Sequence, residues 1–132
     1  MKAEELMTRA VAMRERAYAP YSKFAVGAAL LTQDGTVFGG VNVENASYGL
    51  AICAERTAAV AAVAAGHQQF RAIAIAGPHA TLTAPCGACR QFLNEFNPAL
   101  EVAYTTPNGL KVTTLDQLLA DAFGPKSLDT PG

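Results

Sequence analysis

The sequence predicts an α/β fold in which a mixed β-sheet carries helices on both faces. Segments with helical spacing alternate with short apolar segments typical of strands, and this alternation favours such a sheet. An Asp-Gly pair lies between the first two apolar runs and indicates a hairpin. A chain of 132 residues is about the size of one domain. We therefore expect a single domain over residues 1–126, followed by a loose tail over residues 127–132.

The first third of the chain predicts one helix and one hairpin. Apolar residues recur with helical spacing over residues 3–17, which indicates an amphipathic helix. Pro20 should keep the chain out of the helical conformation beyond that point, because the residue before a proline avoids it. The apolar run over residues 24–32 predicts a buried strand. Asp34-Gly35 then predicts a tight turn to a second, antiparallel strand over residues 36–43.

A second helix is expected over residues 53–65, after a polar loop over residues 42–49. Beyond its first turn this helix consists of alanine and valine on every side. A helix that is apolar all round is normally buried all round. A chain this short has too few other elements to bury the whole helix, so we expect a second subunit to cover part of its surface. Gly66 is the expected residue for the helix end.

The remaining elements continue the alternation. A strand is expected over residues 70–76, a helix over residues 87–96, and strands over residues 100–104 and 110–112. Thr114 followed three positions later by Gln117 has the pattern of a capping box, which predicts a short final helix. The side chains of that helix expected to face the core are Leu115, Leu118, Leu119 and Phe123.

The composition excludes several classes of function. Ten basic and eleven acidic residues give a net charge of −1, and the chain has no basic block that could follow a phosphate backbone, so a polymeric nucleic-acid partner is disfavoured. Mean hydropathy is +0.17, yet no apolar run approaches the ~18 residues of a membrane-spanning helix. Residues 1–5 are partly acidic and open no apolar signal segment, so we expect a cytoplasmic protein without a membrane partner.

The three cysteines, Cys53, Cys86 and Cys89, predict a catalytic zinc site. Catalytic zinc takes three protein ligands and keeps a fourth position open, whereas structural zinc normally closes with a fourth Cys or His. Both cysteine segments fall where helices are expected to begin, and the partial positive charge of a helix amino terminus favours thiolates. The alternatives are a structural zinc ion and a redox dithiol at Cys86 and Cys89.

The order of the motif residues also predicts a catalytic carboxylate. Cys53-Ala54-Glu55 is followed downstream by Pro85-Cys86-Gly87-Ala88-Cys89. Zinc deaminases of nucleobases carry Cys-x-Glu or His-x-Glu and then Pro-Cys-x-x-Cys, with the glutamate as general acid and base. Residues at i and i+2 do not share a helix face. We therefore expect Glu55 to reach the water at the zinc ion rather than the metal itself. Its alternative role is to favour a helix amino terminus.

Over nearly its whole length the chain resembles the cytidine deaminases of the small homotetrameric type. Four segments carry the resemblance: residues 24–29 (Phe-Ala-Val-Gly-Ala-Ala), 42–48 (Asn-Val-Glu-Asn-Ala-Ser-Tyr), 53–56 (Cys-Ala-Glu-Arg) and 85–91 (Pro-Cys-Gly-Ala-Cys-Arg-Gln). The resemblance implies a three-layer α/β/α sandwich around a five-stranded mixed sheet and one Zn²⁺ per subunit. It also implies hydrolysis of cytidine or 2'-deoxycytidine to the uridine product and ammonia, a reaction of pyrimidine salvage.

The resemblance also implies a set of substrate contacts in active sites shared between subunits. Asn42 and Glu44 would bind the ribose hydroxyls, and Phe24 would pack against the base. Backbone groups near Ala54 and Pro85 would read the base edge. The residues expected to act across a subunit boundary are Ala46, Tyr48 and Phe123. A carboxylate at the sugar would repel phosphate, so free nucleosides are expected as substrates rather than nucleotides.

Each of these residues has a simpler structural alternative. Phe24 and Phe123 could be core residues, Asn42 a turn residue, and Tyr48 an interface residue without substrate contact. We expect His67 and His79 to be solvated and to have no catalytic role.

Charge balance points to one further residue. Three thiolates leave a zinc centre with net negative charge, which makes it a poor activator of water. We hypothesise that Arg56 hydrogen-bonds to cysteine sulfurs and offsets part of that charge. Arg90 is a weaker candidate whose alternative is a surface salt bridge.

Three functions remain open at the level of sequence. The first is deamination of cytidine and 2'-deoxycytidine. The second is deamination of another aminopyrimidine nucleoside, such as a nucleoside antibiotic. The third is a non-catalytic zinc-binding or nucleic-acid-binding module, against which the glutamate and the charge balance argue.

Overall fold

Five strands form one mixed sheet in the order β2-β1-β3-β4-β5. The computed structural model describes residues 1–128 of the chain. Strand β3 pairs with β4 in parallel, and the other neighbouring strands are antiparallel. This arrangement confirms the predicted five-stranded mixed sheet. The strands are β1 (Gly27–Thr32), β2 (Val37–Val41), β3 (Phe70–Ala76), β4 (Glu101–Thr106) and β5 (Gly109–Thr114).

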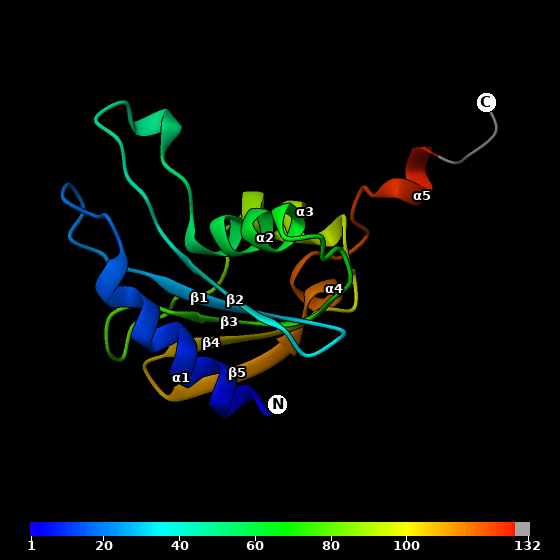
Figure 1. Cartoon of the computed structure of the whole chain (residues 1–132), viewed down its shortest axis with the longest axis horizontal. Helices are drawn as coiled ribbons and strands as arrows, with labels where there is room; N and C mark the ends of the chain where they lie inside the picture. The colour runs from blue at the N-terminus through cyan, green and yellow to red at the C-terminus, as the bar shows by residue number, and fades with distance from the viewer. Residues whose placement is uncertain (129–132) are drawn as a thin grey trace.

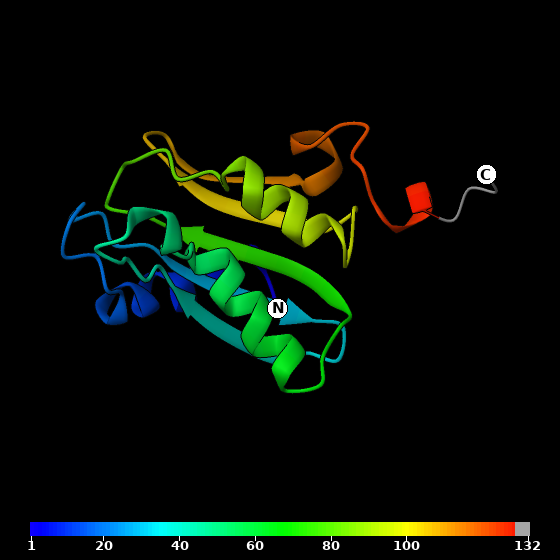
Figure 2. The ribbon, with the colours of Figure 1, turned by 90° about the horizontal axis from the view of Figure 1, so that it is seen from above.

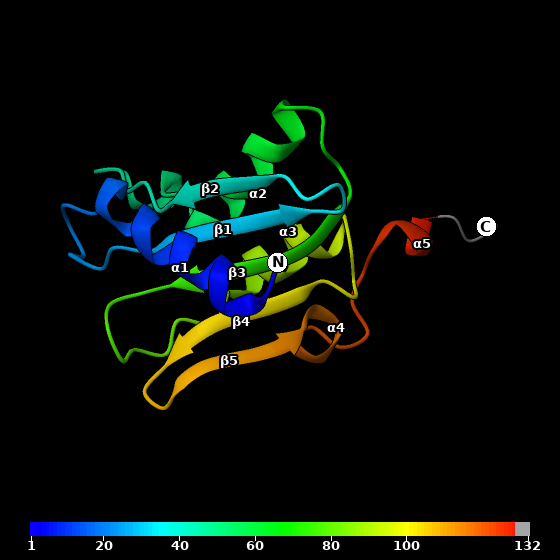
Figure 3. The same ribbon diagram turned by 60° about the horizontal axis from the view of Figure 1, so that its bottom comes forward.

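Helices cover both faces of the sheet and complete the three-layer sandwich. Helix α1 crosses one face, while α2 and α3 lie on the other (Figures 1 and 3). Seen from above, α2 and α3 lie side by side, and α5 lies beyond the ends of the strands (Figure 2). The helices are α1 (Ala3–Met13), α2 (Ala54–Ala64), α3 (Gly87–Asn94), α4 (Leu115–Leu118) and α5 (Pro125–Leu128), with 3₁₀ turns η1 (Arg14–Arg16) and η2 (Tyr48–Leu50).

The two faces of β3 belong to different cores. Ala72, Ala74 and Ala76 face α1, where small side chains let the helix approach the sheet closely. Ile73 and Ile75 face α2 and α3 and pack in the larger core. A central strand that is covered on both faces is apolar along nearly its whole length. This pattern predicts β3 with the bounds that the structure shows.

Helix α2 packs closely on β2 and ends as predicted. A Cβ atom at Gly40 of β2 would collide with the Ala54 carbonyl oxygen, so only glycine permits this approach. Gly66 has a φ of +95° and closes the helix in a Schellman motif, with Gly66 N–H donating to the Val63 carbonyl and His67 N–H to the Ala62 carbonyl.

Only one side of α2 is covered within the single chain. Ala58, Ala59 and Ala62 are fully buried against the sheet, whereas Val60 is 51% exposed and Val63 is 36% exposed. The prediction that one chain cannot cover this helix is therefore consistent with the structure. Within residues 1–128, none of the helices is both long enough and apolar enough to span a membrane.

The predicted capping box is wrong. The Thr114 hydroxyl donates to the Asp116 carboxylate at 2.5 Å instead of capping a backbone N–H, and Gln117 accepts a hydrogen bond from the Thr113 hydroxyl at 2.9 Å. Both side chains therefore have partners other than the helix end. Helix α4 nevertheless begins at Leu115, which is fully buried.

Three further expectations differ at the chain ends. Helix α1 ends at Met13 and continues only as a 3₁₀ turn to Arg16, so it is shorter than residues 3–17. Phe123 does not face the core: α4 ends at Leu118, and the Phe123 side chain is 61% exposed. Of the predicted tail, residues 127–128 belong to α5, and residues 129–132 lie outside the described part of the chain.

Candidate active site

The three cysteines meet where α2 and α3 begin. Cys53 is the N-cap residue of α2, Cys86 is the N-cap residue of α3, and Cys89 lies in the first turn of α3. The Sγ atoms of Cys53 and Cys86 are 3.8 Å apart, and those of Cys86 and Cys89 are 3.4 Å apart. All three ligand atoms lie within 4.8 Å of one another.

These spacings fit zinc. A tetrahedral ion with Zn–S bonds of about 2.3 Å holds its sulfur ligands roughly 3.8 Å apart. Because two helix amino termini converge here, their partial positive charges also favour thiolates. The predicted ligand set is thus brought together, and the donor chemistry and the spacing both suit a three-thiolate zinc site.

Hydrogen bonding distributes protons unequally among the thiols. The contact with the Cys89 thiol, assisted by Arg56, lowers the pKa of Cys53 to about 5. The same contact and burial raise the pKa of Cys89, because a thiol that donates to a thiolate keeps its proton. Binding of a metal ion would require all three cysteines as thiolates and would displace the remaining protons.

Arg56 approaches the sulfur cluster as hypothesised. Its Nη2 atom donates to Cys53 Sγ at 3.7 Å, and this bond raises the pKa of the guanidinium. Among the described residues, the buried Arg56 Nε has no hydrogen-bond partner. The guanidinium therefore contacts the cluster through Nη2.

Glu55 is buried beside the cysteines. The side chain is 4% exposed, and burial raises the pKa of its carboxyl group. It lies in the first turn of α2, where the helix dipole favours a carboxylate. A carboxyl group whose pKa is raised toward that of the groups it exchanges protons with is suited to general acid and base catalysis.

A cavity of about 190 Å³ opens onto the sulfur cluster and Glu55. Six residues predicted for the site line it, drawn from distant parts of the sequence. Pro85 precedes Cys86 in the chain and Cys89 lies 3.4 Å from it, sulfur to sulfur, but neither lines this cavity. Val26, Thr83 and Ala84 also line the cavity and were not predicted as site residues. The lining residues are Phe24, Val26, Asn42, Cys53, Ala54, Glu55, Thr83, Ala84 and Cys86.

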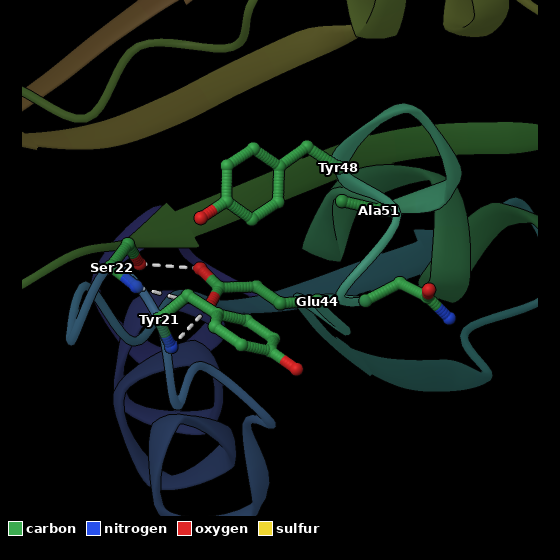
Figure 4. Close-up of a pocket in the computed structure, with 6 residues that line it drawn as sticks. Tyr21, Ser22, Glu44, Tyr48 and Ala51 are labelled. Carbon is green, nitrogen blue, oxygen red and sulfur yellow. Dashed lines mark hydrogen bonds between the residues drawn. The ribbon is translucent and has the colours of Figure 1, made fainter.

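Glu44 and Tyr48 line a different, larger cavity of about 370 Å³ (Figure 4). Tyr21, Ser22, Asn45 and Ala51 form the rest of its wall. The rings of Tyr21 and Tyr48 meet edge to face, with centroids 6.0 Å apart. The three cysteines predicted to bind zinc do not line this cavity. Within one chain, the residues predicted for the sugar are therefore divided between two cavities.

Ala46 and Phe123 line neither cavity. Both are exposed in the single chain. The Phe123 backbone is nevertheless held: its carbonyl accepts hydrogen bonds from Gln91 Nε2 at 2.7 Å and Asn94 Nδ2 at 3.3 Å. The C-terminal segment is thereby attached to α3, the helix that carries two of the cysteines.

Two other expectations are corrected. Arg90 forms no surface salt bridge but donates to the carbonyls of Pro85 at 2.7 Å and Leu118 at 2.8 Å, which ties the Cys86 loop to α4. His67 is not simply solvated, because it is half-buried, packs on Phe38 and lies 3.4 Å from the Asp34 carboxylate. His79 is exposed, as expected.

Comparison with known proteins places these features in one family. The profile described as "Cytidine and deoxycytidylate deaminase zinc-binding region" matches residues 1–106. The chain is 45% identical to a cytidine deaminase of Sporosarcina psychrophila over 130 residues, covering 97% of this chain and 96% of the relative. It is 42% identical to a probable cytidine deaminase of Dictyostelium discoideum, covering 95% of this chain and 86% of the relative.

The fold agrees with solved structures. A cytidine deaminase from Burkholderia pseudomallei superposes with a TM-score of 0.88 at 54% identity, covering 93% of this chain and all of that one. A cytidine deaminase from Mycobacterium leprae gives a TM-score of 0.82 at 43% identity, covering 92% of this chain and 99% of that one. The chain therefore belongs to the cytidine and deoxycytidylate deaminase family of zinc-dependent enzymes.

Proposed function

We propose that this chain catalyses the hydrolytic deamination of cytidine and 2'-deoxycytidine, which yields uridine or 2'-deoxyuridine and ammonia. One observation carries the proposal: three sulfur atoms at zinc-compatible spacing lie beside a buried carboxyl group at the mouth of a cavity. The names of the relatives point to the same substrate class. By the same resemblance we infer a role in pyrimidine salvage in the cytoplasm.

The proton transfers are assigned to Glu55. When zinc is held by Cys53, Cys86 and Cys89, the site gains Lewis acidity that makes water a competent nucleophile at neutral pH. Glu55 takes a proton from the attacking water, delivers it to the ring nitrogen of the base, and later helps ammonia leave. Burial raises the pKa of Glu55, which favours its taking up a proton from the attacking water.

Arg56 is assigned a supporting electrostatic role. Its hydrogen bond withdraws electron density from the Cys53 sulfur and so limits the negative charge that three thiolates place on the site. This role does not require Arg56 to touch the substrate.

Substrate binding is assigned to the walls of the two cavities. We assign Phe24 to packing against the base, and the backbone near Ala54 and Pro85 to its edge; Phe24 and Ala54 line the cavity that holds Glu55. Asn42 and Glu44 are assigned to the sugar hydroxyls. Hydrogen bonds, above all from Ser22, lower the pKa of Glu44, so this group is an anion at neutral pH and repels a 5'-phosphate. Free nucleosides are therefore favoured over nucleotides.

A homotetramer with shared active sites accounts for the exposed residues. Val60 and Val63 leave an apolar strip on α2 that a second copy would cover. Ala46, Tyr48 and Phe123 are exposed in the single chain, which is the situation expected of side chains that complete a neighbour's site.

One assay tests the proposed function. Purified protein is incubated with cytidine, 2'-deoxycytidine or CMP, and loss of cytosine absorbance is followed with and without a chelator. Chelator-sensitive turnover of both nucleosides, with poor turnover of CMP, supports the proposal. Absence of turnover with zinc-loaded protein would reject it.

A further inference from the structure

The Glu44 carboxylate is already engaged by a neighbouring segment of the chain. Its Oε1 accepts the backbone N–H groups of Tyr21 at 3.0 Å and Ser22 at 3.1 Å. Its Oε2 accepts the Ser22 hydroxyl, and Figure 4 shows the carboxylate turned toward Ser22. A carboxylate has about four acceptor positions, so roughly one remains for a ligand, on the oxygen that Ser22 holds.

The same hydroxyl also reaches the base side of the site. Ser22 Oγ accepts the Phe24 N–H at 3.0 Å, which closes a small side-chain turn around Lys23. Lys23, between the two, has a φ of 61°. The Ser22 hydroxyl therefore bonds to the amino end of the Phe24 backbone.

The other end of this segment is held by Asn42. Its Nδ2 donates to the Phe24 carbonyl at 2.8 Å, and its Oδ1 accepts the Val26 N–H at 2.9 Å. Both residues assigned to the sugar are thus hydrogen-bonded to the segment that carries the base-packing aromatic ring. Asn42 bonds to this segment directly, whereas Glu44 is connected to Phe24 through the Ser22 hydroxyl.

We propose that Ser22 is a positioning residue that couples sugar recognition by Glu44 to packing of the base against Phe24. The inference rests on the proposed function. The hydroxyl has one proton, which it gives to Glu44, and it receives the Phe24 N–H on a lone pair; both bonds are made in a single rotamer. Rotation of the Ser22 side chain about χ1 would break its hydrogen bonds with Glu44 and with the Phe24 backbone together, leaving the carboxylate on the two backbone N–H groups alone.

The test is a set of variants assayed on two substrates. Ser22→Ala removes both hydrogen bonds, Ser22→Thr retains the hydroxyl, and Ser47→Ala is the matched control, because Ser47 is an exposed serine in the loop that carries Glu44. For Ser22→Ala we expect kcat/KM for cytidine to fall about tenfold, mostly through KM, as for loss of one charge-assisted hydrogen bond. Ser22→Thr should recover most of the loss, and Ser47→Ala should match the wild type.

The second substrate separates positioning from general damage. 2',3'-Dideoxycytidine has no 2'- or 3'-hydroxyl for Glu44 to bind, so the effect of Ser22→Ala should shrink to about threefold or less on this substrate. Adding Ser22→Ala to Glu44→Gln should likewise cost less than it does in the wild type. Zinc content and the midpoint of thermal unfolding should not change.

Several results would overturn the inference. They are wild-type kinetics for Ser22→Ala, equal losses on cytidine and dideoxycytidine, additivity with Glu44→Gln, or loss of zinc or of thermal stability in Ser22→Ala. An inactive wild-type protein would be distinct from these outcomes, since it would refute the proposed function and this inference with it.

Discussion

The Thr57 hydroxyl joins α2 to the edge strand β2 by bonding to both backbone groups of Val41. Its Oγ1 accepts the Val41 N–H at 2.9 Å, and its one proton lies within reach of two acceptors, the Val41 carbonyl at 2.8 Å and the Ala54 carbonyl at 2.9 Å. Val41 immediately precedes Asn42, and Thr57 follows two residues after Glu55. This pair therefore sets the distance between the sugar side of the site and its proton-transfer side.

Thr57→Val should destabilise the fold and lower activity. Valine keeps the shape but leaves two backbone groups of an edge strand without partners, which costs about 1–3 kcal/mol. Thermal and urea unfolding measure the loss, and Thr57→Ser is the control that retains the hydroxyl. If Thr57→Val unfolded at the same urea concentration as the wild type, this hydrogen bonding would not be structurally important.

Arg56→Gln should lower kcat while zinc remains bound. Removing a group that is hydrogen-bonded to a metal ligand typically costs about 10–100-fold in activity or metal affinity. Steady-state kinetics and metal analysis of the same preparation separate the two effects. Arg71→Gln is the matched control, because Arg71 is exposed on β3. Full turnover by Arg56→Gln at unchanged zinc content would reject the electrostatic role.

The preference for cytidine over CMP should not depend on pH where both Glu44 and the phosphate are fully ionised. Hydrogen bonds, the largest from Ser22, hold the pKa of Glu44 below the usual 4.5, so the carboxylate is lost only as the pH falls through that lowered value. The second ionisation of a phosphate monoester has a pKa of about 6. The ratio of kcat/KM values for cytidine and CMP should therefore stay constant from about pH 7.5 to 9. Glu44→Gln should reduce the ratio across this range; an unchanged ratio would show that another group excludes the phosphate.

Val60→Glu should disrupt the proposed homotetramer. The valine lies on the exposed strip of α2, and a charge buried there without a partner would oppose association. Sedimentation should detect smaller species with reduced activity. Val11→Glu is the control, since Val11 is 49% exposed on α1, away from this strip. A fully active monomer, in either the variant or the wild type, would contradict shared active sites.

Much of the fold could be predicted because local signals and tertiary structure agree. Asp34-Gly35 and Gly66 occupy backbone positions that need a positive φ or a tight turn, and β3 is apolar along its length because both of its faces are covered. The capping box failed because Thr114 and Gln117 each had a competing local partner. A pattern of residue types does not decide among such partners.

The metal cluster could be predicted because its chemistry is carried by residue types at fixed spacing. Ser22 and Thr57 could not, because a serine or threonine hydroxyl has no periodic signature. Their partners, Glu44 and Val41, lie 22 and 16 positions away in the sequence. Only the return of the chain along β2 brings these groups within hydrogen-bonding distance.

Metal analysis and ammonia release on the wild type and Glu55→Ala test the proposed roles of zinc and Glu55. We expect one zinc ion per chain in both proteins. We also expect ammonia release from cytidine to fall by at least about 10²–10⁴-fold in the variant, as for loss of a general acid and base. Wild-type protein without stoichiometric zinc, or a Glu55→Ala variant that releases ammonia at the wild-type rate, would contradict these roles.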